Sequence, residues 1–361
     1  MNKIIPLVIA GLSISIQAFS CTGISLFTSA RDLIQGRTIE WAEYDLESKL
    51  VLSPAGHTYT SVMPDSTAGL TWTAKYGFAG ISVNKNIYIG EGVNEKGLSA
   101  GIFYFKGFGS LDEYNSNERS KSVTDIDFVR WILTNFSSVD EMLARLNTIK
   151  LTPVYIDMNG IHSPTGHWRV SDKSGRNVII EIINNGEIKI FNNIGVLTNS
   201  PGYEWQLTNL SNYLNIGPGT IPSKEFGFYK AKALGAGTGS LGLPGDITPP
   251  SRFIRAAYYL SCNPVYDLPE NAVQSAFHIL SNFDIPIGSE FTLDQHSHIP
   301  AIPSATQWTS VIDHTNLLFY YRTMFDARVR RVKVTESLKN LKSEKYLPLD
   351  EGKFTVTDVN V

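Results

Sequence analysis

The chain has 361 residues, of which 42% are hydrophobic and 18% are charged, and it contains 29 Gly and 17 Pro. This composition is typical of a packed globular protein and excludes a disordered, collagen-like or coiled-coil chain. Lys and Arg total 31 against 34 for Asp and Glu, so the formal charge is −3 and no basic excess is available to neutralise a phosphate backbone. We therefore expect no nucleic-acid partner.

The beginning of the chain differs from the rest. Lys3 supplies a positive charge, and residues 4–16 are apolar apart from two serines. This run is shorter than the roughly 20 residues that a membrane span needs. Ala18 and Ser20 place small residues at positions −3 and −1 of a cleavage site. The pattern predicts a signal peptide over residues 1–20 and export to a bacterial periplasm or the medium.

Cleavage after Ser20 would leave a mature chain, residues 21–361, that begins with Cys21. A terminal cysteine carries its thiol and its α-amine on one residue, and the unperturbed pKa of that amine is about 7.7 to 8. The amine can therefore act as the general base for the neighbouring thiol, as in N-terminal nucleophiles. Cys21 is the candidate nucleophile, and no separate catalytic histidine is required.

Other roles for Cys21 stay open. Lipid attachment, which would give a lipid-anchored binding protein without catalysis, is disfavoured by the bulky Phe19 at −2 and by the lack of Leu at −3. A disulfide with Cys262 is possible in an oxidising compartment, and so is an inert thiol.

Hydrophobic periodicity and capping signals predict alternating blocks of strands and helices. In chain order we expect a hairpin of strands at 23–27 and 37–41, strands at 49–52, 76–83 and 98–105, helices at 125–136 and 138–146, strands at 168–171, 178–183 and 188–191, helices at 203–214, 251–260 and 270–283, and strands at 317–321 and 329–334. Ser138 and Glu141 form a capping box. No repeat or Pro- or Ser-rich linker divides the chain, which favours one α+β domain.

Two motifs match known binding patterns but give only weak evidence for a dinucleotide site or a metal site. Residues 237–242 match the dinucleotide pattern Gly-x-Gly-x-x-Gly, but Pro244 and Gly245 stop any helix that the pattern would open. We expect a loop that lies against another backbone or subunit. His296 and His298 are the only close histidine pair, so a metal site has weak support.

Arg37 and Asn199 are the polar residues that the pattern alone singles out. Arg37 lies on the return strand of the hairpin, sixteen residues after Cys21, where a guanidinium would favour a thiolate or form a structural salt bridge. Asn199 follows a short apolar strand, at a position that suits either chemistry or a plain turn.

Several segments together resemble the choloylglycine hydrolase family of N-terminal nucleophile hydrolases, which includes conjugated bile salt hydrolases and penicillin V acylases. The likeness runs from Cys21 to about Tyr321. Its motifs are Cys21-Thr22, Gly36-Arg37 followed by an acid and an aromatic residue, Asn94-Glu95-Lys96-Gly97-Leu98, Asn193 through Pro201, and Leu243-Pro244-Gly245-Asp246 before Ser251-Arg252-Phe253. The resemblance implies a four-layer αββα sandwich of two mainly antiparallel sheets, a single amidase domain, no metal or cofactor, and usually a homotetramer. Residues 213–242 resemble the assembly loop of the tetrameric members.

The resemblance also implies roles for individual residues. Cys21 would be the nucleophile, and Arg37 and Arg252 would hold positive charge around its thiolate. The side-chain amide of Asn199 and the backbone N–H of Tyr104 would stabilise the oxyanion, with donors of a kind worth roughly a few kcal/mol each. These groups would hydrolyse the C–N bond of an N-acylated small amine through a thioester.

Two positions need comment: position 40 differs from the usual family residue, and at position 104 the members of the family differ from one another. Glu40 stands where the family usually has Asp, and strict alternation puts Arg37 and Glu40 on opposite strand faces, so we expect a bulge or a strand end there. At position 104, Tyr resembles penicillin V acylases and Asn would resemble bile salt hydrolases. Tyr104, Trp41 and Phe105 suit an aromatic wall for the acyl group, so penicillin V is the first substrate to test, before conjugated bile salts and N-acyl homoserine lactones.

Overall fold

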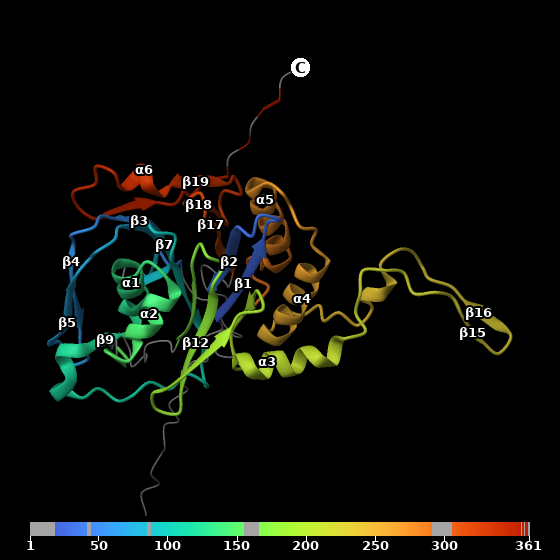
Figure 1. Cartoon of the computed structure of the whole chain (residues 1–361). Coiled ribbons are helices and arrows are strands. Elements are labelled where there is room, and N and C mark those ends of the chain that lie inside the picture. The colour runs from blue at the N-terminus through green and yellow to red at the C-terminus, as the bar shows by residue number, and fades with distance from the viewer. Residues whose placement is uncertain are drawn as a thin grey trace, which may run out of the picture.

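Two antiparallel sheets pack face to face, and helices cover their outer faces (Figure 1). The computed structural model describes residues 19–41, 45–84, 88–154, 166–290, 305–354, 356, 358 and 359. This arrangement confirms the α+β sandwich of two sheets and two helical layers that the resemblance implied.

The first sheet contains the N-terminal hairpin. Its strands, in spatial order, are β14 (Val196–Leu197), β1 (Phe19–Phe27), β2 (Leu33–Trp41), β17 (Ala305–Asp313), β18 (Leu318–Thr323) and β19 (Arg330–Lys333). The second sheet has the order β13 (Glu187–Asn192), β12 (Asn177–Ile183), β11 (Gly166–Ser171), β8 (Ser99–Tyr104), β7 (Tyr88–Asn94), β6 (Phe78–Val83), β3 (Lys49–Ser53) and β20 (Lys345–Pro348). Three small two-stranded pairs complete the described strands: β4 (Thr58–Val62) with β5 (Ala68–Thr73), β9 (Ser122–Thr124) with β10 (Lys150–Thr152), and β15 (Lys224–Phe226) with β16 (Tyr229–Ala231).

The helices divide between the two outer faces. α1 (Asp125–Asn135) and α2 (Val139–Leu146) pack on the second sheet, whereas α4 (Pro249–Cys262) and α5 (Pro269–Leu280) pack on β1 and β2 of the first. α3 (Tyr203–Leu210) lies beside α4, and α6 (Val334–Leu338) follows β19. Short 3-10 turns occupy Ser116–Lys121, Ser211–Tyr213, Thr238–Ser240 and Ser281–Phe283. In the part of the chain that the structure describes, no helix has both the length and the apolar character needed to span a bilayer.

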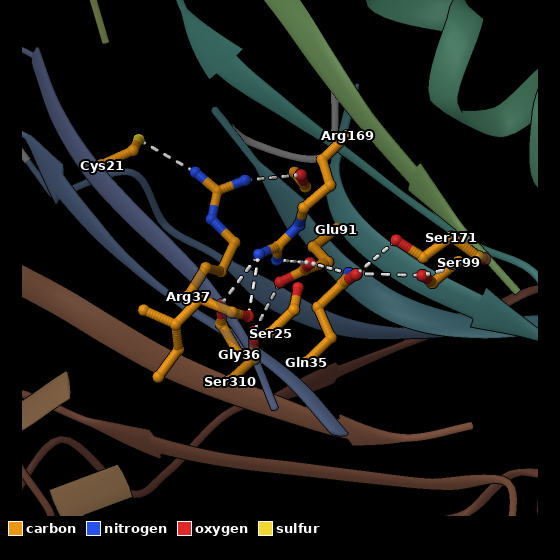
Figure 2. A network of polar contacts seen from close by, with 12 residues as sticks. Cys21, Ser25, Gln35, Gly36, Arg37, Glu91, Ser99, Arg169, Ser171 and Ser310 are labelled. Carbon is orange, nitrogen blue, oxygen red and sulfur yellow. Dashed lines mark hydrogen bonds and ion pairs between the residues drawn. The ribbon is translucent and has the colours of Figure 1, made fainter. Parts of the chain in front are cut away.

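The layer between the sheets is polar where β2 crosses β7 and β11 (Figure 2). Glu91 Oε1 accepts hydrogen bonds from Arg169 Nη2 at 2.7 Å and from Gln35 Nε2 at 3.2 Å, and Ser310 Oγ donates to Glu91 Oε2 at 2.8 Å. All four side chains are fully buried. Because an unpaired buried charge costs several kcal/mol, this network fixes how the two sheets face one another.

Glycine at position 23 allows the two sheets to approach at this layer. A Cβ atom there would lie 2.6 Å from Arg169 Nη1 and 2.8 Å from Phe103 Cζ. The Arg169 guanidinium also donates to the carbonyl oxygens of Ile24 and Gly36. The hairpin therefore brings Cys21 next to a closely packed interface.

The strands and helices that the sequence predicts are all present, with shifts of a few residues at their ends. Ser138 caps α2 as predicted, but the Glu141 carboxylate accepts from the N–H of Ser137 instead of Ser138. Within the two large sheets, the sequence pattern does not predict β7, β17 or β20. Gly90 and Gly92 lower the strand propensity of β7. Strand β17 lacks a clear alternation because it has polar residues on both of its faces, and one face lines the polar layer between the sheets.

The glycine-rich motif at 237–242 belongs to a long exposed arm that extends away from the sandwich (Figure 1). Its central glycine-rich turn is a 3-10 turn, with no dinucleotide-type helix after it, as expected. The arm exposes the large apolar side chains of Phe226, Phe228, Leu234 and Leu241. Such exposed apolar groups are characteristic of a contact surface.

Candidate active site

The thiol of Cys21 lies between the sheets, where Arg37 reaches it. Cys21 is 4% exposed, and Arg37 Nη2 donates to its Sγ at 2.9 Å (Figure 2). The remaining Arg37 donors bind the carbonyl oxygens of Ile102, Gly90 and Thr38, and the guanidinium lies 4.0 Å from the centre of the Phe103 ring. Arg37 forms no ion pair with a described residue, so the salt-bridge alternative does not hold in this part of the chain.

Opposing effects act on the ionisation of this thiol. Burial raises the pKa of Cys21. Arg37, Arg252 and a hydrogen bond from the backbone N–H of Tyr104 lower it, whereas Glu40 raises it further. Burial is the largest of these effects, so the pKa of Cys21 in the uncleaved chain stays above its ordinary value, and the positive charges and the N–H donor offset only part of the rise.

The nitrogen of Cys21 is held by Asn199. The Cys21 N–H donates to Asn199 Oδ1 at 2.7 Å, and Asn199 Nδ2 donates one hydrogen to the carbonyl oxygen of Tyr104 at 3.0 Å. In this chain Cys21 is still joined to Ser20, and the strand continues back to Phe19 in register with β2. The nitrogen is therefore a peptide N–H here, which cannot accept a proton.

Arg252 links the same groups from the helical layer. Its Nη2 donates to Asn199 Oδ1 at 2.8 Å, and its Nη1 donates to Thr22 Oγ1 at 2.9 Å and to the carbonyl oxygen of Cys21. The segment before α4 helps to set this position, because Arg252 Nε donates to the carbonyl oxygen of Ile247 at 2.8 Å and Asp246 accepts hydrogen bonds from Thr248 and from the hydroxyl of Ser251. The bonds from Ser251 and Thr248 lower the pKa of Asp246 to about 2.

Glu40 reaches the site from the opposite strand face to Arg37. The register between β1 and β2 is regular and pairs Glu40 with Ser20, so β2 has no bulge there. Of the two expected features it is the strand end that is present, since β2 ends at Trp41. A bulge lies instead in β17, between Thr306 and Trp308. Thr306 Oγ1 donates to Glu40 Oε1 at 3.0 Å, while Oε2 has no hydrogen-bond partner among the described residues. Burial raises the pKa of Glu40 to about 8, against the opposing charge of Arg252.

A pocket opens beside the sulfur. Its lining residues are Cys21, Ile39, Glu40, Trp41, Tyr88, Ile102, Tyr104 and Gly166. Trp41 and Tyr104 stand where the aromatic wall was expected. Phe105 does not line the pocket: it is fully buried, and its ring stacks on His167 at 4.3 Å. Strand alternation explains this difference, because neighbours 104 and 105 point in opposite directions.

Sequence reasoning missed Ile39 on β2 and three pocket residues of the second sheet, Tyr88, Ile102 and Gly166. Each of these three lies on a different strand of that sheet, β7, β8 and β11. Adjacent strands place them together, which no local pattern reveals. The alternation of polar and apolar residues from His167 to Ser171 marks a strand with one polar inner face, but it does not point to these pocket residues.

The other predicted features are the cysteine pair, the histidine pair and the Asn94 motif. Cys21 and Cys262 are both free thiols, one buried and one exposed, so they form no disulfide. His296 and His298 lie outside the described residues. Among the residues that are described, no group of three or more His, Cys, Asp or Glu side chains could hold a metal ion. The Asn94 motif is a turn, in which the Asn94 side chain binds the backbone of Leu98 and the end of α1.

Known proteins resemble this chain in sequence and in fold. The model of the family described as linear amide C–N hydrolases, choloylglycine hydrolase family, matches residues 21–346. A bile salt hydrolase/transferase of Clostridium perfringens is 31% identical over 332 residues, which cover 90% of this chain and 97% of that protein. The crystal structure of a mutant of the conjugated bile acid hydrolase of the same species has a TM-score of 0.82 and 27% identity, with 94% of this chain and 100% of that chain covered. The penicillin V acylase of Agrobacterium tumefaciens has a TM-score of 0.72 and 25% identity, with 92% and 93% covered. The chain therefore belongs to the choloylglycine hydrolase family and is a hydrolase of linear amide C–N bonds.

Proposed function

We propose that the chain is exported, is cleaved after Ser20, and then uses Cys21 as an N-terminal nucleophile on N-acylated small amines. The observation that carries this proposal is the position of the Cys21 sulfur. It lies at an apolar pocket, receives a hydrogen bond from Arg37, and has the amide of Asn199 beside its nitrogen. Removal of Ser20 would convert the adjacent peptide nitrogen into an amine, which is the base that the uncleaved chain lacks.

The geometry supports each chemical step. The amine of Cys21 takes the thiol proton, and the thiolate attacks the amide carbonyl while Arg37 and Arg252 hold the negative charge nearby. The Tyr104 N–H and the second hydrogen of Asn199 Nδ2 stabilise the oxyanion. The protonated amine then donates to the leaving nitrogen, and water hydrolyses the thioester to regenerate the thiol.

The pocket favours an acyl group with an aromatic ring. Trp41, Tyr88 and Tyr104 line it, together with the aliphatic side chains of Ile39 and Ile102. Aromatic pairs in offset or edge-to-face contact add about 0.5–1.5 kcal/mol beyond area burial. The phenoxyacetyl group of penicillin V fits this chemistry, and we propose it as the leading acyl group.

The first prediction concerns the nucleophile. We expect Cys21→Ala, in the exported and cleaved chain, to lower kcat by at least about a thousandfold because no other group replaces the sulfur. The variant should remain folded with only a small loss of Tm, because Arg37 loses its bond to the sulfur but keeps its three carbonyl acceptors. Mass spectrometry of the wild-type chain should find a free Cys21 amine. Retained hydrolysis in the variant would contradict the assignment of Cys21 as the nucleophile. A diacylglyceryl adduct on the wild type would contradict the proposal and favour a lipid-anchored binding protein.

The second prediction concerns substrate choice. We expect the highest kcat/KM for penicillin V, ahead of a glycine-conjugated bile salt and an N-acyl homoserine lactone, because the pocket wall is aromatic. Tyr104→Asn should reduce penicillin V turnover about tenfold, since the loss of one aromatic contact costs on the order of 1 kcal/mol. A bile salt preference in the wild type would refute the proposed acyl group and leave the nucleophile assignment intact.

The third prediction uses the buried carboxyl of Glu40. Its pKa in the uncleaved chain is raised from 4.5 to about 8, so it destabilises the fold above pH 4.5, and increasingly up to about pH 8. Glu40→Gln should raise the Tm of the uncleaved chain by a few degrees at pH 8 and leave it unchanged at pH 4. In the cleaved chain the new ammonium group supplies a partner for Oε2, so the same substitution should lower Tm and kcat. Equal effects in both forms would contradict this role.

The fourth prediction concerns assembly. We propose a homotetramer in which the exposed arm contacts other subunits through Phe228 and Leu234. Gly217 and Gly239 lie together at the base of the arm, where the Gly217 N–H donates to the Gly239 carbonyl at 3.0 Å. Joining residues 217 and 239 by a short Gly-Ser linker should therefore remove the arm and yield a monomer or dimer by light scattering. A tetramer that survives this deletion, or a monomeric wild type, would exclude the proposal.

A further inference from the structure

A buried histidine and glutamate lie behind the proposed oxyanion site. We propose that His167, oriented by Glu181, is a positioning residue that holds the two backbone segments carrying Tyr104 and Asn199. This inference rests on the proposed function, because it assigns a role in that same reaction. His167 is on β11 and Glu181 is on the adjacent β12, and neither side chain is more than 4% exposed.

The first contact is with the segment that carries Asn199. His167 Nε2 lies 2.9 Å from the carbonyl oxygen of Thr198, the residue immediately before Asn199. A carbonyl oxygen can only accept a hydrogen bond, so Nε2 carries a hydrogen and donates it. The other ring nitrogen, Nδ1, lies 3.2 Å from Glu181 Oε1. The carboxyl group thus fixes the direction in which the ring points.

The second contact lies on the far side of the same turn. Glu181 Oε1 accepts the backbone N–H of Tyr203 at 2.7 Å, at the first residue of α3. A carboxylate is favoured at a helix N-terminus by the unpaired N–H groups and the helix dipole. His167 and Glu181 therefore hold residues 198 and 203, one on each side of the turn that presents Asn199.

The third contact is with the segment that carries Tyr104. The rings of His167 and Phe105 are 4.3 Å apart and inclined by only 6°, and both are fully buried. Phe105 directly follows Tyr104, and in the register of β11 and β8 Gly166 pairs with Tyr104. One imidazole ring therefore contacts the neighbours of both proposed oxyanion donors.

This arrangement has a specific consequence for catalysis. Oxyanion donors must be held within about 0.5 Å of their productive positions, and loss of one costs about 10²–10³ in kcat. No hydrogen bond of the described residues joins His167 or Glu181 to Cys21 or Arg37. Displacement of the ring should therefore weaken transition-state stabilisation, while the hydrogen bond from Arg37 to the Cys21 sulfur is kept.

The test compares His167→Leu with His167→Gln, whose side-chain amide can still donate to Thr198. Both are made in a Cys262→Ser background, so that Cys21 is the only thiol. We expect His167→Leu to lower kcat about 10- to 100-fold with KM changed less than about threefold, and Gln to restore most of the loss. The rate of Cys21 alkylation by iodoacetamide should fall much less than kcat in both, because the two arginine charges that act on the thiol remain and only the weaker Tyr104 hydrogen bond is disturbed.

The matched control is His314→Leu. His314 is also fully buried, with its ring nitrogens bonded to the carbonyl oxygen of Leu33 and to Ser99 Oγ, away from Asn199 and Tyr104. A similar loss of Tm is expected in both Leu variants, but kcat should fall only in His167→Leu. An undiminished kcat in folded His167→Leu, or parallel falls in kcat and alkylation rate, would overturn the inference.

A readout independent of turnover separates this inference from the proposed function. Hydrogen exchange should become faster for residues 198–203 in His167→Leu and in Glu181→Leu, and should be unchanged there in His314→Leu. If the wild type hydrolyses none of the three substrates, the proposed function fails, and exchange still decides whether the pair holds this turn. Unchanged exchange in both the His167 and the Glu181 variants would refute it.

Discussion

The structure depends on how a fully buried cation, Arg37, is satisfied. Its donors bind three backbone carbonyl oxygens and the sulfur of Cys21, and no carboxylate among the described residues pairs with it. A buried charge without a counter-ion is costly, so the site gains most when the sulfur itself is negative. The interaction that completes the packing of the two sheets is thus the same one that favours the thiolate.

The two sheets can bury Arg37 because, near the site, their polar side chains face the layer between the sheets and their apolar side chains face the helices. Their outer faces carry the apolar residues that pack on the helices, while the inner layer near the site holds Glu91, Arg169 and Gln35. Glu91 forms its ion pair with Arg169, so it does not pair with Arg37, whose Nη2 donates to the sulfur of Cys21 instead. His167 and Glu181 continue the polar layer to the turn of Asn199. The inner layer consequently links the stability of the sandwich to the geometry of the proposed reaction.

The peptide bond between Ser20 and Cys21 separates two chemical states of one site. In the described chain β1 runs through this bond, and Glu40 lies opposite Ser20 with one carboxyl oxygen unpartnered among the described residues. Under the proposed cleavage the nucleophile gains an amine as its base, and Glu40 gains a cationic partner when that amine has taken the thiol proton. Glu40 and Arg37 need no bulge in β2 to share this site, because they approach Cys21 from opposite faces of the sheet.

The sequence by itself determined the features that depend on near neighbours along the chain: the hairpin of Cys21 and Arg37, the helices α1 to α5, and the chemistry open to a terminal cysteine. Family resemblance added Glu40, Tyr104 and Arg252 and gave a role to Asn199, and the structure brings these residues together around Cys21. Only the tertiary structure decided that Phe105 lies behind the pocket, that Tyr88 and Gly166 line it, and that Glu181 faces His167. Periodicity reports which face of a strand a residue occupies, whereas its partners depend on strand order and on packing between sheets, which join residues far apart in sequence.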